Sequence, residues 1–399
     1  MGMLFEGGAI FDGEVLQRDG WAALIEGETI AEVGPCAAFD GYGGPRRDIA
    51  GLTLLPGLID AHAHLTLSGT IDGFSSSLAV SRARLTLSAL ENAQACLQGG
   101  ITALRDCGGV DHVELAVRDA CNSGRHPGPT IRAAGKFICM TGGANYSVAR
   151  IADGPTEIVA AVREQIHVGC DCIKLMATGG VLTPGNAVEQ AHYTCEELAV
   201  GVREAKRFAK PVASHAIGAA GALNAARAGV DSIEHGVFLT DECIREMLAR
   251  QIFLVPTLAA TTNIMANLQN GFSAEVREKV ERAAQSHRRS VKAYHDAGGR
   301  IAMGADTGTP FNPHGRNAQE LRYMVDAGMS PVAALTAATV NGAALLQLPT
   351  RGRIRKGCIA DLLLVAGDPT RDIECVADRT NHRGVFKSGA PVALASVLS

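Results

Sequence analysis

Two histidines separated by a single residue end the apolar stretch LPGLIDAHAHL, residues 54–64. Side chains on a β-strand alternate between its two faces, so His62 and His64 are expected to point the same way. Two neutral imidazoles placed like this can bind one divalent metal ion. Histidines with this spacing also occur in polar loops and as hydrogen-bonded core residues, so the other apolar stretches have to decide between these interpretations.

Four more side chains of metal-binding or reactive type lie near the ends of other short apolar stretches. The stretches CIKLMATGG, VASHA, SIEHG and IAMGADTG carry Lys174, His215, His235 and Asp306. Each residue alone has a structural explanation, such as a core histidine or a helix N-cap. Together they would place several costly buried polar groups at one edge of the fold, which favours a shared metal-binding and catalytic site.

The surroundings of Lys174 are informative because its neighbours Ile173, Leu175 and Met176 are apolar. A buried ammonium next to metal ions would be both desolvated and repelled. Reaction of the amine with carbon dioxide would give a carbamate, an anion with two oxygens that is able to bridge two metal ions. A lysine that forms a Schiff base is the competing interpretation. The nearby histidines favour the bridging carbamate.

Between residues 57 and 351, apolar stretches alternate with helix-like segments. We expect strands in GLIDAHAHL, ITALRDC, TIRAAG, CDCIKLMA, PVASHA, VDSIEH, IFLVPT and RIAMGAD. Helical patterns fall at about residues 83–99, 112–124, 155–169, 194–209, 218–229, 240–251, 273–298 and 316–327. About eight such units favour a (β/α)₈ barrel. A doubly wound sheet would also alternate, but no GxGxxG turn follows the first strand. Both chain ends are typical of short strands joined by turns.

Composition excludes several classes of protein. The chain has 399 residues and a formal charge of −4, so we expect no nucleic-acid partner. The N-terminus lacks a secretion signal and no apolar run is long enough to span a bilayer, so we expect a cytoplasmic protein that does not bind membranes. The 11 cysteines show no CxxC pair, which favours reduced, buried thiols.

In their order and strand-end positions, the motifs LPGLIDAHAHL, CIKLMATGG, SHA, SIEHG and GADTG resemble those of the amidohydrolase superfamily. Within it, the chain is similar to the imidazolonepropionase-related group of metal-dependent amidases and dipeptidases, which includes prolidase-like enzymes. The resemblance implies an α/β fold with a (β/α)₈ TIM barrel at residues 57–351. It also implies a small β-sandwich domain formed by both termini, residues 1–56 and 352–399.

The resemblance further implies two divalent metal ions, expected to be zinc. One would be held by His62, His64 and Asp306 and the other by His215 and His235, with carboxylated Lys174 and a hydroxide bridging them. Two such ions lower the pKa of a shared water and polarise the scissile carbonyl. Lys174 and Asp306 are the expected catalytic residues, because Asp306 is placed to accept the proton of the hydroxide and pass it to the leaving nitrogen.

The loops after the strands are expected to bind the substrate. Tyr146 and Tyr193 are candidates to donate a hydroxyl hydrogen bond to the scissile carbonyl, although packing on the next helix is an equal explanation for Tyr193. Arg150, His314 and Arg316 are candidates to hold a substrate carboxylate. Many members of the resembled group carry a histidine just after the Thr-Gly-Gly that corresponds to residues 141–143. This sequence has Ala144 and Asn145 there.

From these features we expect a hydrolase of amide bonds in small molecules, namely dipeptides or N-acyl amino acids. An Xaa-Pro dipeptidase, similar to prolidase, is the leading version. A carboxypeptidase for C-terminal Arg or Lys and a cyclic amide hydrolase similar to imidazolonepropionase use the same metals and remain alternatives. A barrel that only binds a ligand would show gaps among the six expected metal-binding positions, and the sequence has none. Association into a homo-oligomer is a further expectation.

Overall fold

Parallel strands form the centre of the larger part of the molecule. The computed structural model describes residues 2–18, 20–183 and 185–394. One parallel sheet joins three strands in the order β10-β9-β8: β8 (Leu58–Ala63), β9 (Ile101–Asp106) and β10 (Thr130–Ala133). A second runs in the order β12-β11-β13-β14-β15-β16: β11 (Ile138–Cys139), β12 (Arg150–Ile151), β13 (Ile173–Met176), β14 (Val212–Ala216), β15 (Ser232–His235) and β16 (Phe253–Val255).

The segment expected to form the eighth strand, RIAMGAD, has one isolated bridge within it and one just after it, instead of a continuous strand. Ile301 bridges Leu254 of β16, and Thr307 bridges Ala63 of β8, both in parallel. The amide of Ala61 donates to the carbonyl of Met303 at 2.8 Å, so this segment contacts both sheets. Asp306 has a φ of 57°, which takes the backbone out of the extended conformation where the strand would end.

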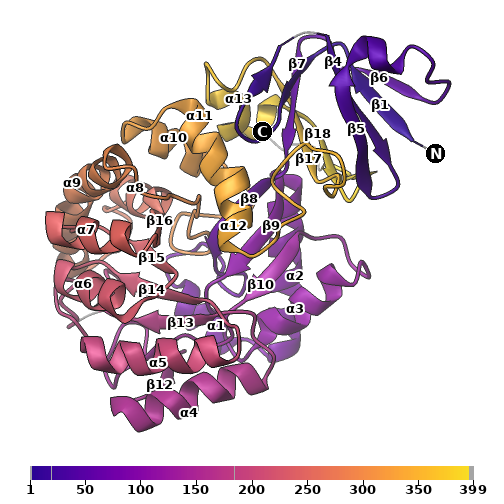
Figure 1. The fold of residues 1–399 in the computed structure, drawn as a ribbon. Helices are drawn as coiled ribbons and strands as arrows, with labels where there is room; N and C mark the ends of the chain where they lie inside the picture. The colour runs from indigo at the N-terminus through magenta and orange to yellow at the C-terminus, as the bar shows by residue number, and fades with distance from the viewer. Residues whose placement is uncertain (1, 19, 184, 395–399) are drawn as a thin grey trace.

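Helices surround these strands, as Figure 1 shows. Eight of them match the expected positions: α2 (Arg82–Gln98), α3 (Val113–Asn122), α4 (Gly154–His167), α5 (Cys195–Arg207), α6 (Ala219–Ala228), α7 (Asp241–Ala249), α9 (Ala274–Asp296) and α10 (Gln319–Asp326). Local signals explain their starts, for example the capping box of Thr194 and Glu197 at α5. The arrangement is a TIM-barrel-like α/β fold.

The structure adds five short helices that the sequence patterns did not indicate individually. They are α1 (Gly73–Ala79), α8 (Leu258–Ala266), α11 (Pro331–Thr336), α12 (Gly342–Leu345) and α13 (Glu374–Ala377). A π-helical turn at Ala337–Asn341 connects α11 to α12. Helix α8 follows β16 directly and lies beside α9 in Figure 1, over one side of the strand ends.

Both chain ends form sheets of their own, at the upper right of Figure 1. The first has the order β5-β4-β1-β6: β1 (Met3–Glu6), β4 (Trp21–Glu26), β5 (Thr29–Pro35) and β6 (Arg46–Asp48). The second has the order β19-β18-β17-β7-β2-β3: β2 (Ala9–Phe11), β3 (Leu16–Gln17), β7 (Leu52–Pro56), β17 (Leu362–Ala366), β18 (His382–Lys387) and β19 (Ala390–Pro391). Phe5, Ile25, Leu54, Leu364 and Phe386 share one buried cluster, so N-terminal and C-terminal residues pack together. The outer ends of the expected terminal domain, residue 1 and residues 395–399, lie outside the described residues.

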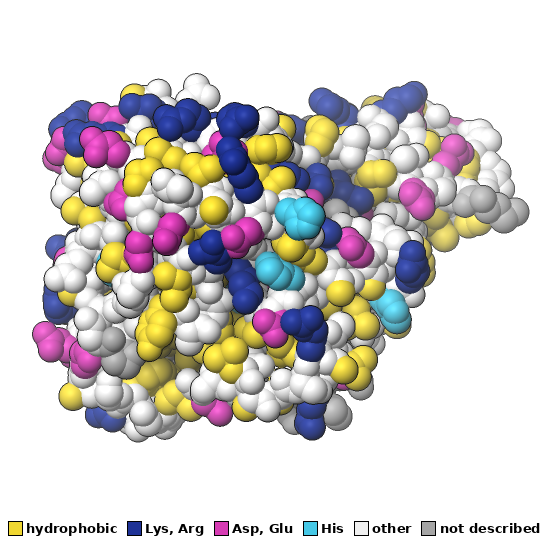
Figure 2. Space-filling view, turned by 90° about the horizontal axis from the view of Figure 1, so that it is seen from below, with side chains coloured by type: hydrophobic (Ala, Val, Ile, Leu, Met, Phe, Trp, Pro, Cys, Tyr) yellow, Lys and Arg dark blue, Asp and Glu magenta, His cyan; other side chains and the backbone are white. Residues whose placement is uncertain are grey.

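The surface seen from below mixes acidic, basic and apolar side chains, so this face shows no large area of one charge (Figure 2). All 11 cysteines are free, and nine of them are buried. Among the described residues, no helix has the length and apolar character needed to cross a bilayer.

Candidate active site

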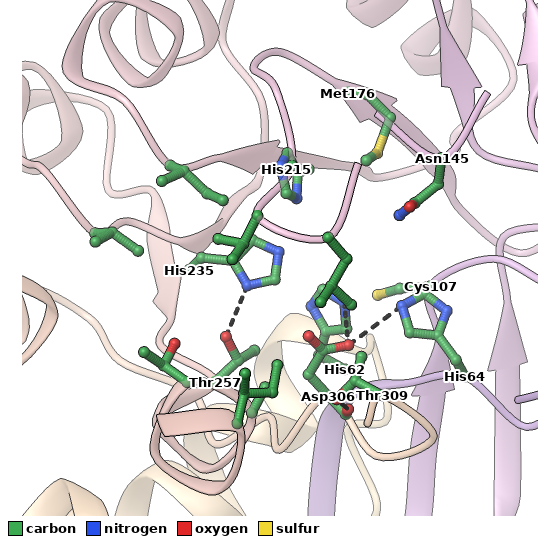
Figure 3. A pocket seen from close by; sticks show the side chains of 18 of the residues that line it. His62, His64, Cys107, Asn145, Met176, His215, His235, Thr257, Asp306 and Thr309 are labelled. Carbon is green, nitrogen blue, oxygen red and sulfur yellow. Dashed lines mark hydrogen bonds and ion pairs between the residues drawn. The ribbon is translucent and has the colours of Figure 1, made fainter. Parts of the chain in front are cut away.

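The structure brings the six expected metal-binding residues together at one end of the parallel strands. His62 and His64 lie at the end of β8, Lys174 in β13, His215 in β14 and His235 at the end of β15. Asp306 lies in the segment between β16 and β8. All six side chains line one cavity that is open to solvent. Figure 3 shows the four histidines and Asp306 around it. Residues from five parts of the chain therefore converge on one space.

Asp306 is close to both histidines of the opening motif. Its Oδ1 lies 3.5 Å from His62 Nε2 and 3.3 Å from His64 Nε2. That oxygen is buried, and no described residue donates a conventional hydrogen bond to it. An uncompensated carboxylate oxygen beside two imidazole nitrogens is the environment that a divalent cation fits.

His215 and His235 lie on the neighbouring strands. Their ring centroids are 4.6 Å apart, and the ring of His235 is 5.1 Å from that of His62. Ligand atoms of His62, His235 and Asp306 lie within 4.8 Å of one another. The two ligand sets that the resemblance implies are thus contiguous, with His62 between them.

Each of the four histidines has one ring nitrogen engaged and the other available. Nδ1 of His62 lies 2.7 Å from the carboxylate of Glu234, and Nδ1 of His64 lies 2.8 Å from the carbonyl oxygen of Gly108. Nδ1 of His235 lies 2.7 Å from Thr257 Oγ1, whereas in His215 it is Nε2 that makes the contact, 3.1 Å from the carbonyl oxygen of Gly179. Such contacts fix the tautomer and direction of a metal-binding imidazole.

Burial and the nearby Lys174 ammonium lower the pKa of His215 to about 3 and hold the pKa of His62 well below its usual value. Burial also lowers the pKa of His235 strongly. For His64 burial acts in the same direction, but the nearby Asp306 carboxylate, 3.3 Å from Nε2, outweighs it and raises the pKa. Three of the four rings are therefore neutral at physiological pH, which is the form that binds metals.

Lys174 is buried, with 2% of its surface exposed. No carboxylate of the described residues lies within 4.0 Å of its ammonium. A buried amine without a partner anion is costly in its charged form. The environment of Lys174 therefore favours a chemical modification of its amine or the binding of another group to it.

Behind the histidines lies a buried ion pair that the motifs did not indicate. Glu234 accepts from His62 through Oε2 and from Arg105 Nη2 through Oε1, the latter at 2.7 Å. Arg105 also donates from Nε to the carbonyl of Ala61 at 2.7 Å, which ties β9 to β8. A charged residue inside the apolar stretch ITALRDC was the available sequence signal for this pair.

Asp60 connects the opening motif to the segment that carries Asp306. Its Oδ1 accepts from the amides of His62 at 2.9 Å and Ala305 at 3.1 Å, and its Oδ2 accepts from Asn317 Nδ2 at 2.7 Å. Burial raises the pKa of Asp60 to about 6, although these donors oppose the shift. This carboxylate therefore fixes the separation of His62 and Asp306.

We expect Glu234→Gln to lower the free energy of unfolding of the metal-free protein by about 3–5 kcal/mol, because Arg105 would keep a buried charge without its anion. The two side chains are 3% and 0% exposed. Urea unfolding measures the change, with Glu242→Gln as the control because the pair of Glu242 and Arg227 is exposed and worth about 1 kcal/mol or less. A loss no larger than that of the control would show that Glu234 is dispensable for stability.

The cavity wall away from these residues is mostly apolar. It is contributed by α1, β13, α8, α9, the residue before β11 and the loops after β9, β13, β14 and β15. The apolar lining residues are Phe74, Cys107, Phe137, Met176, Val181, Leu182, Ile217, Val237, Ala260, Ile264, Val280 and Ala283. Its uncharged polar side chains are Asn145, Thr257, Thr261 and Thr309. Among the described lining residues, only Lys174 and Asp306 carry a formal charge besides the histidines.

None of the five residues expected to bind substrate lines this cavity. Tyr193 is 1% exposed and its hydroxyl donates to the carbonyl of Ala152 at 2.7 Å, so it serves packing. Tyr146 is 51% exposed, and the neighbouring Asn145 lines the cavity in its place.

The three expected carboxylate-binding residues have other surroundings. Arg150 forms two hydrogen bonds with Glu164, at 2.6 and 2.7 Å. His314 contacts the carbonyl of Leu67 at 3.0 Å, and Arg316 is exposed. The direction of each side chain depends on loop packing that the sequence pattern does not contain.

The chain belongs to the Amidohydrolase family, whose model matches residues 53–392. It is a hydrolase that acts on amide bonds, in a family that generally uses divalent metals.

Three known proteins are similar over most of the chain. A Xaa-Pro dipeptidase with bound methionine in its active site is 31% identical, with a TM-score of 0.90, 98% of this chain and 99% of the other covered. A prolidase complexed with N-methylphosphonate-L-proline is 29% identical, with a TM-score of 0.89 and the same coverage. Ochratoxinase of Aspergillus niger is 31% identical over 369 residues, which cover 84% of this chain and 75% of the relative.

Proposed function

We propose that this protein is a binuclear metal-dependent hydrolase of dipeptides or N-acyl amino acids, with Xaa-Pro dipeptides as the leading substrates. The observation that carries the proposal is the convergence of six side chains on one cavity, with a buried Asp306 oxygen that lacks a conventional hydrogen bond. Similarity to a Xaa-Pro dipeptidase and to a prolidase supports the substrate class.

The donor set fits two divalent ions, for which zinc is the first candidate. His62, His64 and Asp306 would hold one ion, and His215 and His235 the other. Lys174, as a carbamate, would contribute one oxygen to each, which converts a costly buried cation into a useful anion. Support for this comes from the unpaired Lys174 and from the free ring nitrogen of each histidine.

When bound, such an ion pair supplies a hydroxide nucleophile near neutral pH and polarises the scissile carbonyl. Asp306 then acts as general base and general acid. Its carboxylate accepts the proton released as the new carbon–oxygen bond forms, and donates it to the nitrogen as the carbon–nitrogen bond breaks.

The apolar wall also bears on the substrate. An uncharged, bulky side chain would gain from burial there, whereas a cationic one would find Asp306 as the only carboxylate among the described lining residues. This disfavours the carboxypeptidase for C-terminal Arg or Lys. N-acyl amino acids with apolar groups are the second candidate, favoured by the wall and by similarity to ochratoxinase.

A substrate screen tests the assignment. We expect release of amine from L-Xaa-L-Pro dipeptides with apolar Xaa residues, and rates lower by at least about tenfold when Xaa is Lys or Asp, because the wall would bury a charge. N-acyl-L-proline and N-acyl-L-phenylalanine give the matched comparison for the second candidate. Turnover of a cyclic amide with no turnover of any linear amide would contradict the proposal.

We also infer that the parallel strands close into a (β/α)₈ barrel through residues 301–307, and that the two terminal sheets form a sandwich. Support for closure comes from the hydrogen bonds of this segment to β8 and β16. The buried cluster shared by both sheets supports the sandwich. The sandwich domain would then comprise residues 1–56 and 352–399, and the barrel domain residues 57–351.

A further inference from the structure

His235 has an unusual backbone for a metal-binding residue on a strand. Its φ is 72°, in the left-handed region that residues other than glycine seldom adopt. Such a conformation persists only where the surrounding structure holds it. The contacts of its carbonyl and ring therefore decide where the imidazole points.

The carbonyl of His235 is held by a residue far away in the sequence. His287 of α9 is 1% exposed, and its Nε2 lies 3.0 Å from that carbonyl oxygen. A carbonyl only accepts, so Nε2 carries the proton and donates. Nδ1 of His287 then accepts from the hydroxyl of Thr261, at 3.2 Å.

Helix α8, which carries Thr261, also holds the ring of His235. Thr257 and Thr261 are one turn apart at the start of α8, and both line the cavity. Thr257 contacts Nδ1 of His235 directly at 2.7 Å (Figure 3), whereas Thr261 acts on its carbonyl through His287. Glu320 fixes this end of α8 by accepting from the amides of Leu258 at 2.8 Å and Ala259 at 2.6 Å.

We propose that His287 is a positioning residue for the second metal, which keeps the backbone of His235 left-handed so that the Nε2 of His235 faces the cavity. This inference rests on the proposed function, because it concerns how a proposed metal ligand is oriented. His287 does not line the cavity. Its action on the metal site passes through the carbonyl of His235, and Thr261 supports it from the cavity side.

Two substitutions of His287 separate this role from core packing. In His287→Gln the amide nitrogen replaces Nε2, so the donor to the His235 carbonyl is kept. In His287→Asn the shorter side chain replaces only Nδ1, so that donor is lost. Thr261→Val removes the hydroxyl at nearly constant volume, and Thr262→Val is the control because Thr262 lies next to it but not in the cavity lining.

The experiment measures zinc transfer from the loaded proteins to a chromophoric chelator, with hydrolysis and thermal unfolding followed in parallel. We expect His287→Asn to bind the weaker of its two zinc ions about 10–100-fold less tightly than the unsubstituted protein. Thr261→Val should show a smaller loss of the same kind. His287→Gln and Thr262→Val should stay within about threefold of the unsubstituted protein, well below that range.

Equal zinc affinity in His287→Asn and His287→Gln would overturn the positioning role, as would a loss confined to thermal stability. If His287→Asn does not fold, an unchanged zinc affinity in Thr261→Val overturns it. Failure of the proposed function looks different, because the unsubstituted protein itself would then bind no zinc.

Discussion

Replacing Lys174 with alanine should reduce hydrolysis by about 10³-fold or more, since the activation of water and substrate by paired metal ions is worth several kcal/mol and each 1.4 kcal/mol is a factor of ten. The protein should remain folded, because the substitution removes a buried amine that no described carboxylate neutralises. Steady-state kinetics and metal analysis of the same preparation measure both parts of the effect.

Lys292→Ala is the control for Lys174→Ala, because Lys292 is exposed and pairs only with Asp296 on α9. Added formate or acetate should restore part of the activity of Lys174→Ala, since a free carboxylate would replace the carbamate that we propose for Lys174. Normal turnover by Lys174→Ala without any added carboxylate would show that Lys174 does not bridge metal ions.

Asp306→Asn should lower kcat by roughly 10²–10⁴-fold, the range for loss of a general acid and base. An amide neither accepts the proton nor returns it to the leaving nitrogen, and it is a weaker metal ligand. Loss of thermal stability should be small, because Oδ1 of Asp306 accepts no conventional hydrogen bond from the described residues.

The kinetic test of Asp306→Asn uses a fixed Xaa-Pro substrate at saturating zinc, so that weaker metal binding does not limit the rate. Asp296→Asn, on the exposed face of α9, is the control and should keep full activity. An Asp306→Asn rate within threefold of the unsubstituted rate would remove Asp306 from the proton transfer.

The sequence predicted the site best where the burial of a polar side chain is costly unless it has a partner. His62, Lys174, His215, His235 and Asp306 are costly when buried alone, so their repeated occurrence at apolar stretch ends indicated a common site, and the structure places them around one cavity. The parallel strands and their helices were predictable for a similar reason, since buried strands and amphipathic helices differ in hydrophobic period.

The interrupted pairing of the eighth strand, helix α8 and the orientations of the loop side chains were not predictable in this way. RIAMGAD has a strand pattern, but its backbone pairs only in isolated bridges at Ile301 and at the following Thr307, and it turns at Asp306. Helix α8 is short and mostly apolar, so although Pro256 marks the end of the preceding strand, the pattern that follows does not identify a helix. The orientations of Tyr193 and Arg150 are set by Ala152 and Glu164, partners that a single sequence does not connect to them.

The metal content of the purified protein tests the central claim most directly. After expression with added zinc and removal of loosely bound ions, elemental analysis should give close to two ions per chain, with one or none in Lys174→Ala. A chain that hydrolyses Xaa-Pro dipeptides at full rate with no bound metal would contradict the account.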